Sequence, residues 1–311
     1  MTRPSRGEII NDSPSLAVVT TTLNRADLLE ELYESLRVQS DTDFTWYVVD
    51  DGSADRTKLF IQHLSRTATF PIRLLANKST IGKCASLNRV FSEANTDICV
   101  VVDSDDTITP EAVRLMKAAV SASEQDESIG AIFFRYVDPE LKLIGPTLPH
   151  EDIRLSRARH DETFGKYDGC VGYLRRVYSA IGYPEYPGER YLGPTVLQLL
   201  MEPKWKMWFT NTVVGVAVYR AGGLTAQGRA LRVKNPRSMM KYTQLQFQQA
   251  SSLQSRLKYG AMYFAYRRFC GQRLRSELRG YPLERLLGRG MGLALSTYWR
   301  YRIRSKYGGV G

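Results

Sequence analysis

The sequence has few cysteines and no long apolar run. Its four cysteines, Cys84, Cys99, Cys170 and Cys270, lie too far apart in the chain for a Cys-x-x-Cys zinc or redox site. No apolar segment reaches the roughly 18 residues of a membrane-spanning helix, and residues 1–14 lack the apolar core of a signal peptide. We therefore expect a cytoplasmic protein with reduced thiols and a flexible N-terminal arm over residues 1–14.

Acidic residues are scarce at the end of the chain. Residues 231–311 contain 17 lysines and arginines but only two acidic residues, which leaves 26 basic and 30 acidic residues in positions 1–230. This tail also contains the aromatic residues Tyr263, Phe264, Tyr266, Phe269, Tyr298, Trp299 and Tyr301. We expect a basic, aromatic-rich helical extension over residues 231–311.

Two interpretations of this extension remain open. In the first, it docks on an anionic membrane surface, which would hold the protein at the inner face of the cell membrane. In the second, a helix pair packs its aromatic residues on the rest of the protein and leaves a basic face in water. Nucleic acid is disfavoured as a partner because the sequence contains no recognised nucleic-acid-binding motif.

Apolar stretches alternate with helical patterns over the first 138 residues. We expect strands at 16–22, 44–50, 70–76, 97–103 and 130–138, and helices at 25–40, 54–66, 82–94 and 110–123. This alternation predicts an α/β fold in which a Rossmann-like, mostly parallel sheet is flanked by helices. Residues 139–230 are less regular, with a helix expected at 194–202 and a strand at 209–219. One or two helices over 236–270 and basic helix fragments are expected beyond them.

Polar clusters end three of these predicted strands. The first strand ends in three threonines, the second in Asp50 and Asp51, and the fourth in Asp103, Asp105 and Asp106. Because the carboxyl ends of parallel strands meet at one edge of a sheet, we expect these clusters to form one ligand site. Asp103 and Asp105 can share Mn²⁺ or Mg²⁺ through oxygen ligands, which would offset their mutual repulsion and favour a phosphate-bearing ligand.

Two common phosphate-binding motifs are missing. The segment around Gly82 and Lys83 has Asn77 where the Walker motif requires glycine, and Cys84 where it requires serine or threonine. No Gly-x-Gly-x-x-Gly loop follows the first strand, which weakens a dinucleotide interpretation.

Four sequence elements together resemble the family 2 glycosyltransferases, which are inverting nucleotide-diphospho-sugar transferases with the GT-A fold. In order, they are Thr20 to Asn24, then Asp50-Asp51-Gly52-Ser53 with Asp55 and Thr57, then Asn77…Gly82-Lys83…Asn88, and finally Asp103-x-Asp105-Asp106. They cover residues 16–113 in the order and spacing of the family.

The resemblance implies a donor site for a sugar linked to UDP or dTDP. It assigns nucleotide contacts to Thr20, Thr22, Asn24, Asp51, Lys83, Asp103 and Ser104, and ligation of a Mn²⁺ or Mg²⁺ cofactor to Asp105 and Asp103. Asp51 would accept a hydrogen bond from the imide N–H of the base, and Lys83 would lie near the base or the phosphates. The metal would stabilise the charge of the departing nucleoside diphosphate.

The second half of the chain carries a fainter resemblance. The segment PEYPGER (184–190) is similar to a Pro-Glu-x-x-Gly-Glu-(Lys/Arg) segment in the acceptor half of some bacterial members. The resemblance implies a catalytic base here, and Glu189 is the candidate, with Glu185 and Asp168 in reserve. Related chains often have a further Glu where this sequence reads Gly-Pro-Thr at 193–195. The Gln-x-x-Arg-Trp signature of processive synthases is missing, which favours transfer of a single sugar.

These patterns predict a division of the chain into parts with different tasks. After the arm, residues 15–138 would form the nucleotide-sugar-binding half, residues 139–230 the acceptor-binding half, and residues 231–311 the helical extension. His63 is expected to be structural, and His150 or His160 could complete the metal site. The predicted enzyme would act in the synthesis of a cell-surface glycan or a glycosylated metabolite, with an unknown glycan, lipid-linked or small-molecule acceptor.

Two other functions compete with this hypothesis. A nucleotidyltransferase can share a similar core and two carboxylates, but it usually has a glycine-rich basic loop after the first strand. A non-catalytic module would use the core as a scaffold and the basic tail for membrane or nucleic-acid binding.

Overall fold

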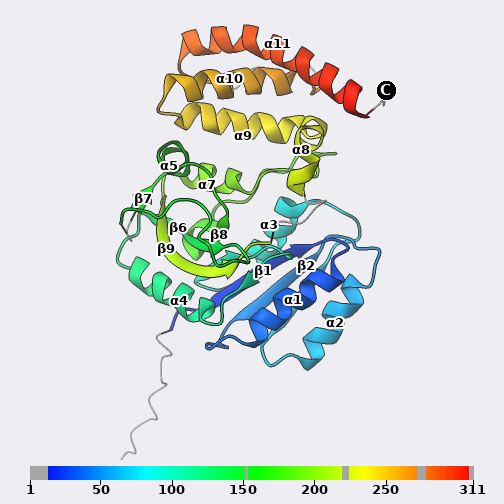
Figure 1. Cartoon of the computed structure of the whole chain (residues 1–311), viewed down its shortest axis with the longest axis vertical. Coiled ribbons are helices and arrows are strands. Elements are labelled where there is room, and N and C mark those ends of the chain that lie inside the picture. The colour runs from blue at the N-terminus through cyan, green and yellow to red at the C-terminus, as the bar shows by residue number, and fades with distance from the viewer. Residues whose placement is uncertain (1–12, 151–152, 219–223, 272–277, 308–311) are drawn as a thin grey trace, which may run out of the picture.

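The computed structural model describes residues 13–150, 153–218, 224–271 and 278–307 (Figure 1). The predicted arm therefore lies almost wholly outside the described residues. The strands are β1 (Leu16–Thr22), β2 (Thr45–Asp50), β3 (Ile72–Ala76), β4 (Ile98–Val101), β5 (Thr107–Ile108), β6 (Ile129–Val137), β7 (Ile153–Leu155), β8 (Gly169–Leu174) and β9 (Lys206–Val216). The described residues form one nine-stranded sheet, whose order is β3-β2-β1-β4-β8-β6-β9-β5, with β7 paired to β9.

Helices cover both faces of this sheet. They are α1 (Ala26–Arg37), α2 (Thr57–Thr67), α3 (Lys83–Glu93), α4 (Ala112–Ser123), α5 (Arg157–Phe164), α6 (Arg175–Tyr178) and α7 (Thr195–Met201). Apolar residues of α1, α2 and α4 pack with one face of the strands, and those of α3, α5 and α7 pack with the other. Because β1 to β4 are covered on both sides, they are almost continuously apolar.

The sheet is parallel where the predicted βαβ units lie. β1 pairs in parallel with β2 and β4, and β2 pairs in parallel with β3. The remaining half is mixed, because β8 runs antiparallel to both β4 and β6. The predicted α/β fold with a mostly parallel sheet is confirmed, whereas β5, β7 and β8 were not expected from the sequence.

The remaining helices form a separate layer at the C-terminal end (Figure 1). They are α8 (Leu224–Lys234), α9 (Pro236–Gln249), α10 (Leu253–Arg267) and α11 (Pro282–Tyr307). α10 lies between α9 and α11 and packs on both, around a buried cluster of their own apolar side chains. The predicted helical extension is confirmed, but its last part is one long helix and not a set of fragments. None of the described helices has the length and apolar character needed to cross a membrane.

Candidate active site

A cleft of about 730 Å³ lies at the carboxyl ends of β1, β2 and β4. This volume is within the range of about 300–1,000 Å³ typical of small-molecule sites. The strand ends contribute Thr21, Thr22, Leu23, Arg25, Asp51, Asp103, Ser104, Asp105 and Asp106 to its wall. The predicted meeting of the polar strand ends is thus confirmed.

Two cations compensate the aspartates of the Asp-x-Asp-Asp segment. Arg25, which follows β1, contacts the Asp105 carboxylate at 3.1 Å, and Lys83, in the first turn of α3, forms an ion pair with Asp103. Burial lowers the pKa of Lys83, but the Asp103 carboxylate outweighs this effect and the pKa is raised overall. Lys83 is therefore a cation at neutral pH.

The third aspartate of the segment has a raised pKa. Burial, followed by the nearby charges of Asp103 and Asp105, raises the pKa of Asp106 to about 8. Arg25 and Lys83 are the cations that contact the other two aspartates of the segment.

Asp51 organises the loop that enters α3. Its carboxylate accepts hydrogen bonds from the backbone N–H of Ile81 at 2.8 Å and of Gly82 at 2.9 Å, and from the Asn77 amide at 2.7 Å. Gly82 has a φ of +99°, and a Cβ atom there would lie 1.9 Å from the carbonyl oxygen of Arg190. The loop that enters α3 therefore touches the segment near Arg190, and only glycine fits at position 82.

Glu189 binds the C-terminal helices and not the cleft. Its two carboxylate oxygens accept hydrogen bonds from the backbone N–H groups of Arg237 and Ser238, each at 2.8 Å, at the start of α9. A carboxylate at this position satisfies unpaired N–H groups and interacts favourably with the helix dipole. Glu189 is also not among the residues of the described cleft wall, so this placement gives no support to Glu189 as the base, and that assignment stays a prediction.

This placement predicts a structural role for Glu189. Glu189→Ala should lower the free energy of unfolding by about 1–2 kcal/mol, the usual effect of removing a helix N-terminal cap. Urea denaturation measures this loss, and Glu185→Ala is the matched control because the exposed Glu185 carboxylate accepts a hydrogen bond from the Asn88 amide and not from a helix terminus. An unchanged stability for Glu189→Ala would contradict the capping role.

Of the three carboxylates considered for the base, Asp168 is the one in the described cleft wall. It precedes β8, which pairs antiparallel with β4 so that Val171 lies opposite Val101. The start of β8 therefore lies beside the end of β4, where Asp103 follows. The fold thus brings Asp168 to the donor edge of the sheet from a distant part of the sequence.

Residues 17–182 match the sequence profile of glycosyl transferase family 2. The match covers more than half of the chain. The chain belongs to glycosyl transferase family 2.

Two named glycosyltransferases are similar to part of this chain. The chain is 32% identical over 124 residues to dolichol-phosphate mannosyltransferase of Pyrococcus furiosus, covering 39% of this chain and 33% of the relative. It is 26% identical over 121 residues to the putative glycosyltransferase EpsE of Bacillus subtilis, covering 39% of this chain and 44% of the relative. The chain thus spans less than half the length of these relatives.

Solved structures confirm the GT-A type of the fold. The structure of residues 1–349 of S. aureus TarS in complex with UDP-GlcNAc aligns with a TM-score of 0.59 and 15% identity, over 94% of this chain and 92% of that one. The mannosyltransferase PcManGT from Pyrobaculum calidifontis, in complex with GDP-Man and Mn²⁺, aligns with a TM-score of 0.55 and 17% identity, over 94% and 84% of the two chains. At this identity, the likeness concerns the fold alone.

The fold places some of the other proposed nucleotide-binding residues in the cleft wall and others behind it. Thr22 and Ser104 line the cleft, and the buried hydroxyl of Thr22 has no hydrogen-bond partner among the described residues. Thr20 is fully buried, and its hydroxyl accepts a hydrogen bond from the Trp46 indole at 3.0 Å. The Asn24 side chain accepts a hydrogen bond from the Ala54 backbone N–H at 2.8 Å and so braces the loop that follows β2. Thr20 and Asn24 therefore support the site from behind its described wall.

The two candidate histidines lie away from the cleft wall. His150 is exposed, whereas His160 is buried and stacked on Phe209 with ring centroids 3.7 Å apart. Burial lowers the pKa of His160, and its ring hydrogen-bonds the Tyr167 hydroxyl at 2.7 Å. Within the described ranges, no group of three or more His, Cys, Asp and Glu side chains is placed to hold a metal. A third metal ligand from His150 or His160 stays a prediction.

The two aspartates nevertheless provide a donor set that fits a hard divalent cation. Asp103 and Asp105 present carboxylate oxygens in one cleft, and Mg²⁺ or Mn²⁺ is often held by one or two carboxylates together with substrate phosphates and water. Arg25 and Lys83 contact the same two carboxylates, which shows that these oxygens accept positively charged partners.

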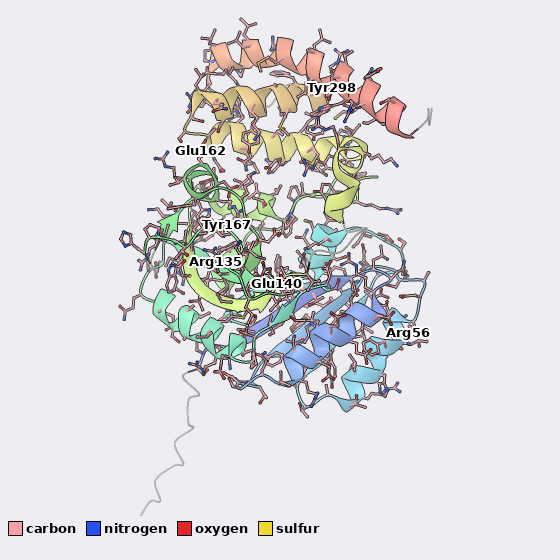
Figure 2. All side chains as sticks on the ribbon, in the orientation of Figure 1. Arg56, Arg135, Glu140, Glu162, Tyr167 and Tyr298 are labelled. Carbon is pink, nitrogen blue, oxygen red and sulfur yellow. The ribbon has the colours of Figure 1, made fainter. Side chains whose placement is uncertain are left out.

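Several cleft residues were not found by sequence reasoning. The part of the wall away from the strand ends of β1, β2 and β4 is lined by Phe133, Arg157, Tyr167, Tyr173, Tyr183, Arg190 and Gln198. Arg135 supports this wall, with its guanidinium 4.3 Å from the centre of the Tyr167 ring (Figure 2). Only Arg25 had a usable signal, since it directly follows the first polar cluster. The others come from separate elements, whose meeting no local pattern reveals.

Proposed function

We propose that this family 2 member is an inverting glycosyltransferase that moves one sugar from a UDP- or dTDP-linked donor to an acceptor hydroxyl. The observation that carries the proposal is the meeting of Asp51, Asp103, Asp105 and Lys83 in one cleft at the carboxyl ends of β1, β2 and β4. The neighbours of similar fold support a nucleotide-sugar donor, since UDP-GlcNAc is bound to TarS and GDP-Man to PcManGT.

On the donor side, one residue would bind the base of the nucleotide and the others would neutralise its diphosphate. Asp51 would accept a hydrogen bond from the base, in addition to holding the loop that begins α3. Asp103 and Asp105 would hold Mn²⁺ or Mg²⁺, which supplies positive charge to the departing diphosphate. Arg25 and Lys83 would exchange their carboxylate partners for phosphate oxygens as the donor enters, so that no charge in the cleft is left uncompensated.

On the acceptor side, we propose Asp168 as the catalytic base. An acceptor hydroxyl is a weak nucleophile at neutral pH, and a carboxylate near its proton increases its reactivity. Asp103 and Asp105 would be occupied by the cation. Asp168 lines the same cleft and comes from the start of β8, so it could face the sugar from the side opposite the diphosphate, as inversion requires.

The acceptor wall favours a sugar or a similar ligand with both polar and apolar faces. Phe133, Tyr167, Tyr173 and Tyr183 line this part of the cleft with ring surfaces and hydroxyl groups. Aromatic rings can pack on the C–H faces of a sugar while its hydroxyls bind polar groups. The names of relatives, such as a dolichol-phosphate mannosyltransferase and a succinoglycan biosynthesis protein, support a role in surface-glycan synthesis.

Isothermal titration with UDP and Mn²⁺, followed by a panel of nucleotide sugars scored by donor hydrolysis, tests this function. A transferase should bind UDP in a Mn²⁺-dependent manner and hydrolyse one donor much faster than the others. A nucleotidyltransferase would instead use a nucleoside triphosphate. A non-catalytic scaffold would bind neither nucleotide.

The nucleotide contact of Asp51 leads to a separate prediction. Asp51→Ala should weaken UDP binding by about 1–3 kcal/mol, because a buried polar partner is removed and the loop at Gly82 loses its acceptor. Titration calorimetry measures the change. Asp50→Ala is the control, because the buried Asp50 braces the loop after β2 by accepting from the Ser53 N–H at 3.0 Å and is not in the described cleft wall. Equal UDP affinity in wild type and Asp51→Ala would remove Asp51 from the donor site.

A further inference from the structure

The outermost helix, α11, packs on α10 along one of its sides (Figure 1). Gly288 and Gly292 allow this approach, since a Cβ atom at Gly288 would lie 3.0 Å from the backbone of Gly260, and one at Gly292 would lie 2.8 Å from the carbonyl oxygen of Ala261. Trp299 is almost fully buried on the same side, 4.9 Å from the Tyr266 ring. The inner side of α11 is therefore defined by small residues and one tryptophan.

The outer side of α11 is apolar and exposed. Its large exposed side chains are Leu283 (63%), Leu286 (63%), Leu287 (48%), Met291 (47%), Leu293 (49%), Tyr298 (53%) and Tyr301 (69%). Many of them lie three, four or seven residues apart, as in the pairs Leu283/Leu287, Leu287/Met291 and Met291/Tyr298, which places the set along one face of a helix. Tyr298 marks this face in Figure 2. We refer to these seven residues as the outer face of α11.

The exposed face of α11 is not made of the aromatic residues that are prominent in the sequence of the tail. Tyr263, Phe264, Tyr266 and Trp299 are buried between α9, α10 and α11. The second interpretation expected these aromatic residues to pack on the rest of the protein, whereas they pack mainly among the C-terminal helices themselves. The exposed apolar surface is instead made mainly of leucines, together with Tyr298 and Tyr301.

Positive charge borders the outer face. The helix sequence contains six basic residues and one acidic residue, Glu284, and Glu284 pairs with Arg256 of α10 at 3.0 Å. Arg289, Arg300 and Arg302 are exposed. By helical position, Arg289 and Arg300 flank the outer face on one side and Arg302 flanks it on the other. The surface is thus an apolar strip with guanidinium groups along both edges.

We propose that α11 lies flat in the surface of an anionic lipid bilayer, with its outer face among the upper acyl chains and its arginines at the lipid phosphates. The outer face runs from Leu283 to Tyr301, so this contact would be about 27 Å long. An exposed apolar strip edged by cationic side chains is the pattern of helices that lie in a membrane interface, and the long arginine side chains reach from that depth to the headgroups. A second copy of this chain fits less well, because pairing two such faces would bring arginines together without opposing carboxylates.

Vesicle sedimentation tests the proposal with the full-length protein. Wild type should pellet with vesicles of mixed phosphatidylglycerol and phosphatidylcholine, and much less with vesicles of phosphatidylcholine alone. Binding to the mixed vesicles should decrease as added salt screens the arginines. The double variant Leu283→Glu/Leu287→Glu should reduce binding to the anionic vesicles by about tenfold or more. Leu59→Glu is the control, since Leu59 is also an exposed leucine (69%) but lies on the distant helix α2, and it should bind as wild type does.

The control measurements separate this proposal from the catalytic one. UDP affinity and the melting temperature should be unchanged in all variants, because the outer face is remote from the cleft wall. The membrane proposal is overturned if wild type does not pellet, or if the double variant pellets equally well. It is also overturned if wild type is a dimer that the double variant converts to a monomer without any vesicle binding. Each of these results leaves the donor-site proposal standing.

Discussion

Replacing Asp105 by alanine is expected to lower kcat by about 10³-fold or more. Asp105 lies in the cleft at the end of β4, where its carboxylate contacts Arg25 at 3.1 Å. In the proposed reaction, this carboxylate holds the divalent cation against the diphosphate, whose negative charge grows as the sugar departs. Removing such stabilisation of a developing charge typically costs several kcal/mol in the transition state.

Two measurements separate loss of the cation from loss of the fold. Steady-state kinetics gives kcat, and titration with UDP in the presence and absence of Mn²⁺ gives the metal-dependent part of nucleotide binding. In Asp105→Ala, the effect of Mn²⁺ on UDP affinity should disappear, while the melting temperature changes little. Asp27→Ala is the control, since exposed Asp27 pairs with Arg56 outside the described cleft wall. Full activity of the wild type in EDTA would reject the metal role.

Asp168→Asn should lower kcat by about 10²–10⁴-fold and leave UDP affinity unchanged. The amide keeps the shape of the side chain but cannot accept the proton of the acceptor hydroxyl, and general-base catalysis contributes about this much. The acidic limb of the pH profile of kcat/KM should also disappear, which a purely structural defect would not cause. Kinetics across a pH series measures both effects.

Glu189→Gln is the matched control for the base. Glu189 caps α9 through Arg237 and Ser238, so this variant should keep kcat within a few-fold of wild type. A large loss in Glu189→Gln together with normal turnover in Asp168→Asn would return the base to Glu189. Analysis of the product by NMR should show an anomeric configuration opposite to that of the donor. Retained configuration would overturn the inverting mechanism.

The donor edge was predictable because its signals are local. Each polar cluster directly follows its own apolar strand, and the alternation of strands and helices over the first 138 residues defines parallel βαβ units. Those two facts alone place Asp51 and Asp103 at one edge of one sheet. The ion pairs that neutralise the acidic cluster were harder to predict from the sequence, because Arg25 and Lys83 lie on other elements than Asp105 and Asp103.

The acceptor side was less predictable because β8 and β6 join the sheet in an order that the sequence pattern does not reveal. Asp168 reaches the cleft only because β8 pairs antiparallel with β4. Glu189 was assigned to catalysis from its surroundings in the sequence, but its partners lie 48 and 49 residues further along the chain. A loop carboxylate that caps a distant helix looks the same, in sequence, as one that faces a substrate.

The sequence by itself thus determined the fold class, the donor edge and the basic character of the tail, because strand and helix periodicity and net charge are properties of contiguous residues. The tertiary structure decided which carboxylates face the cleft and which surface of the tail is exposed. Trp299 and Tyr301 are two residues apart in the same helix, yet Trp299 is buried against α10 and Tyr301 is 69% exposed. Their environments depend on how α10 and α11 pack, and that packing is fixed by long-range contacts rather than by local pattern.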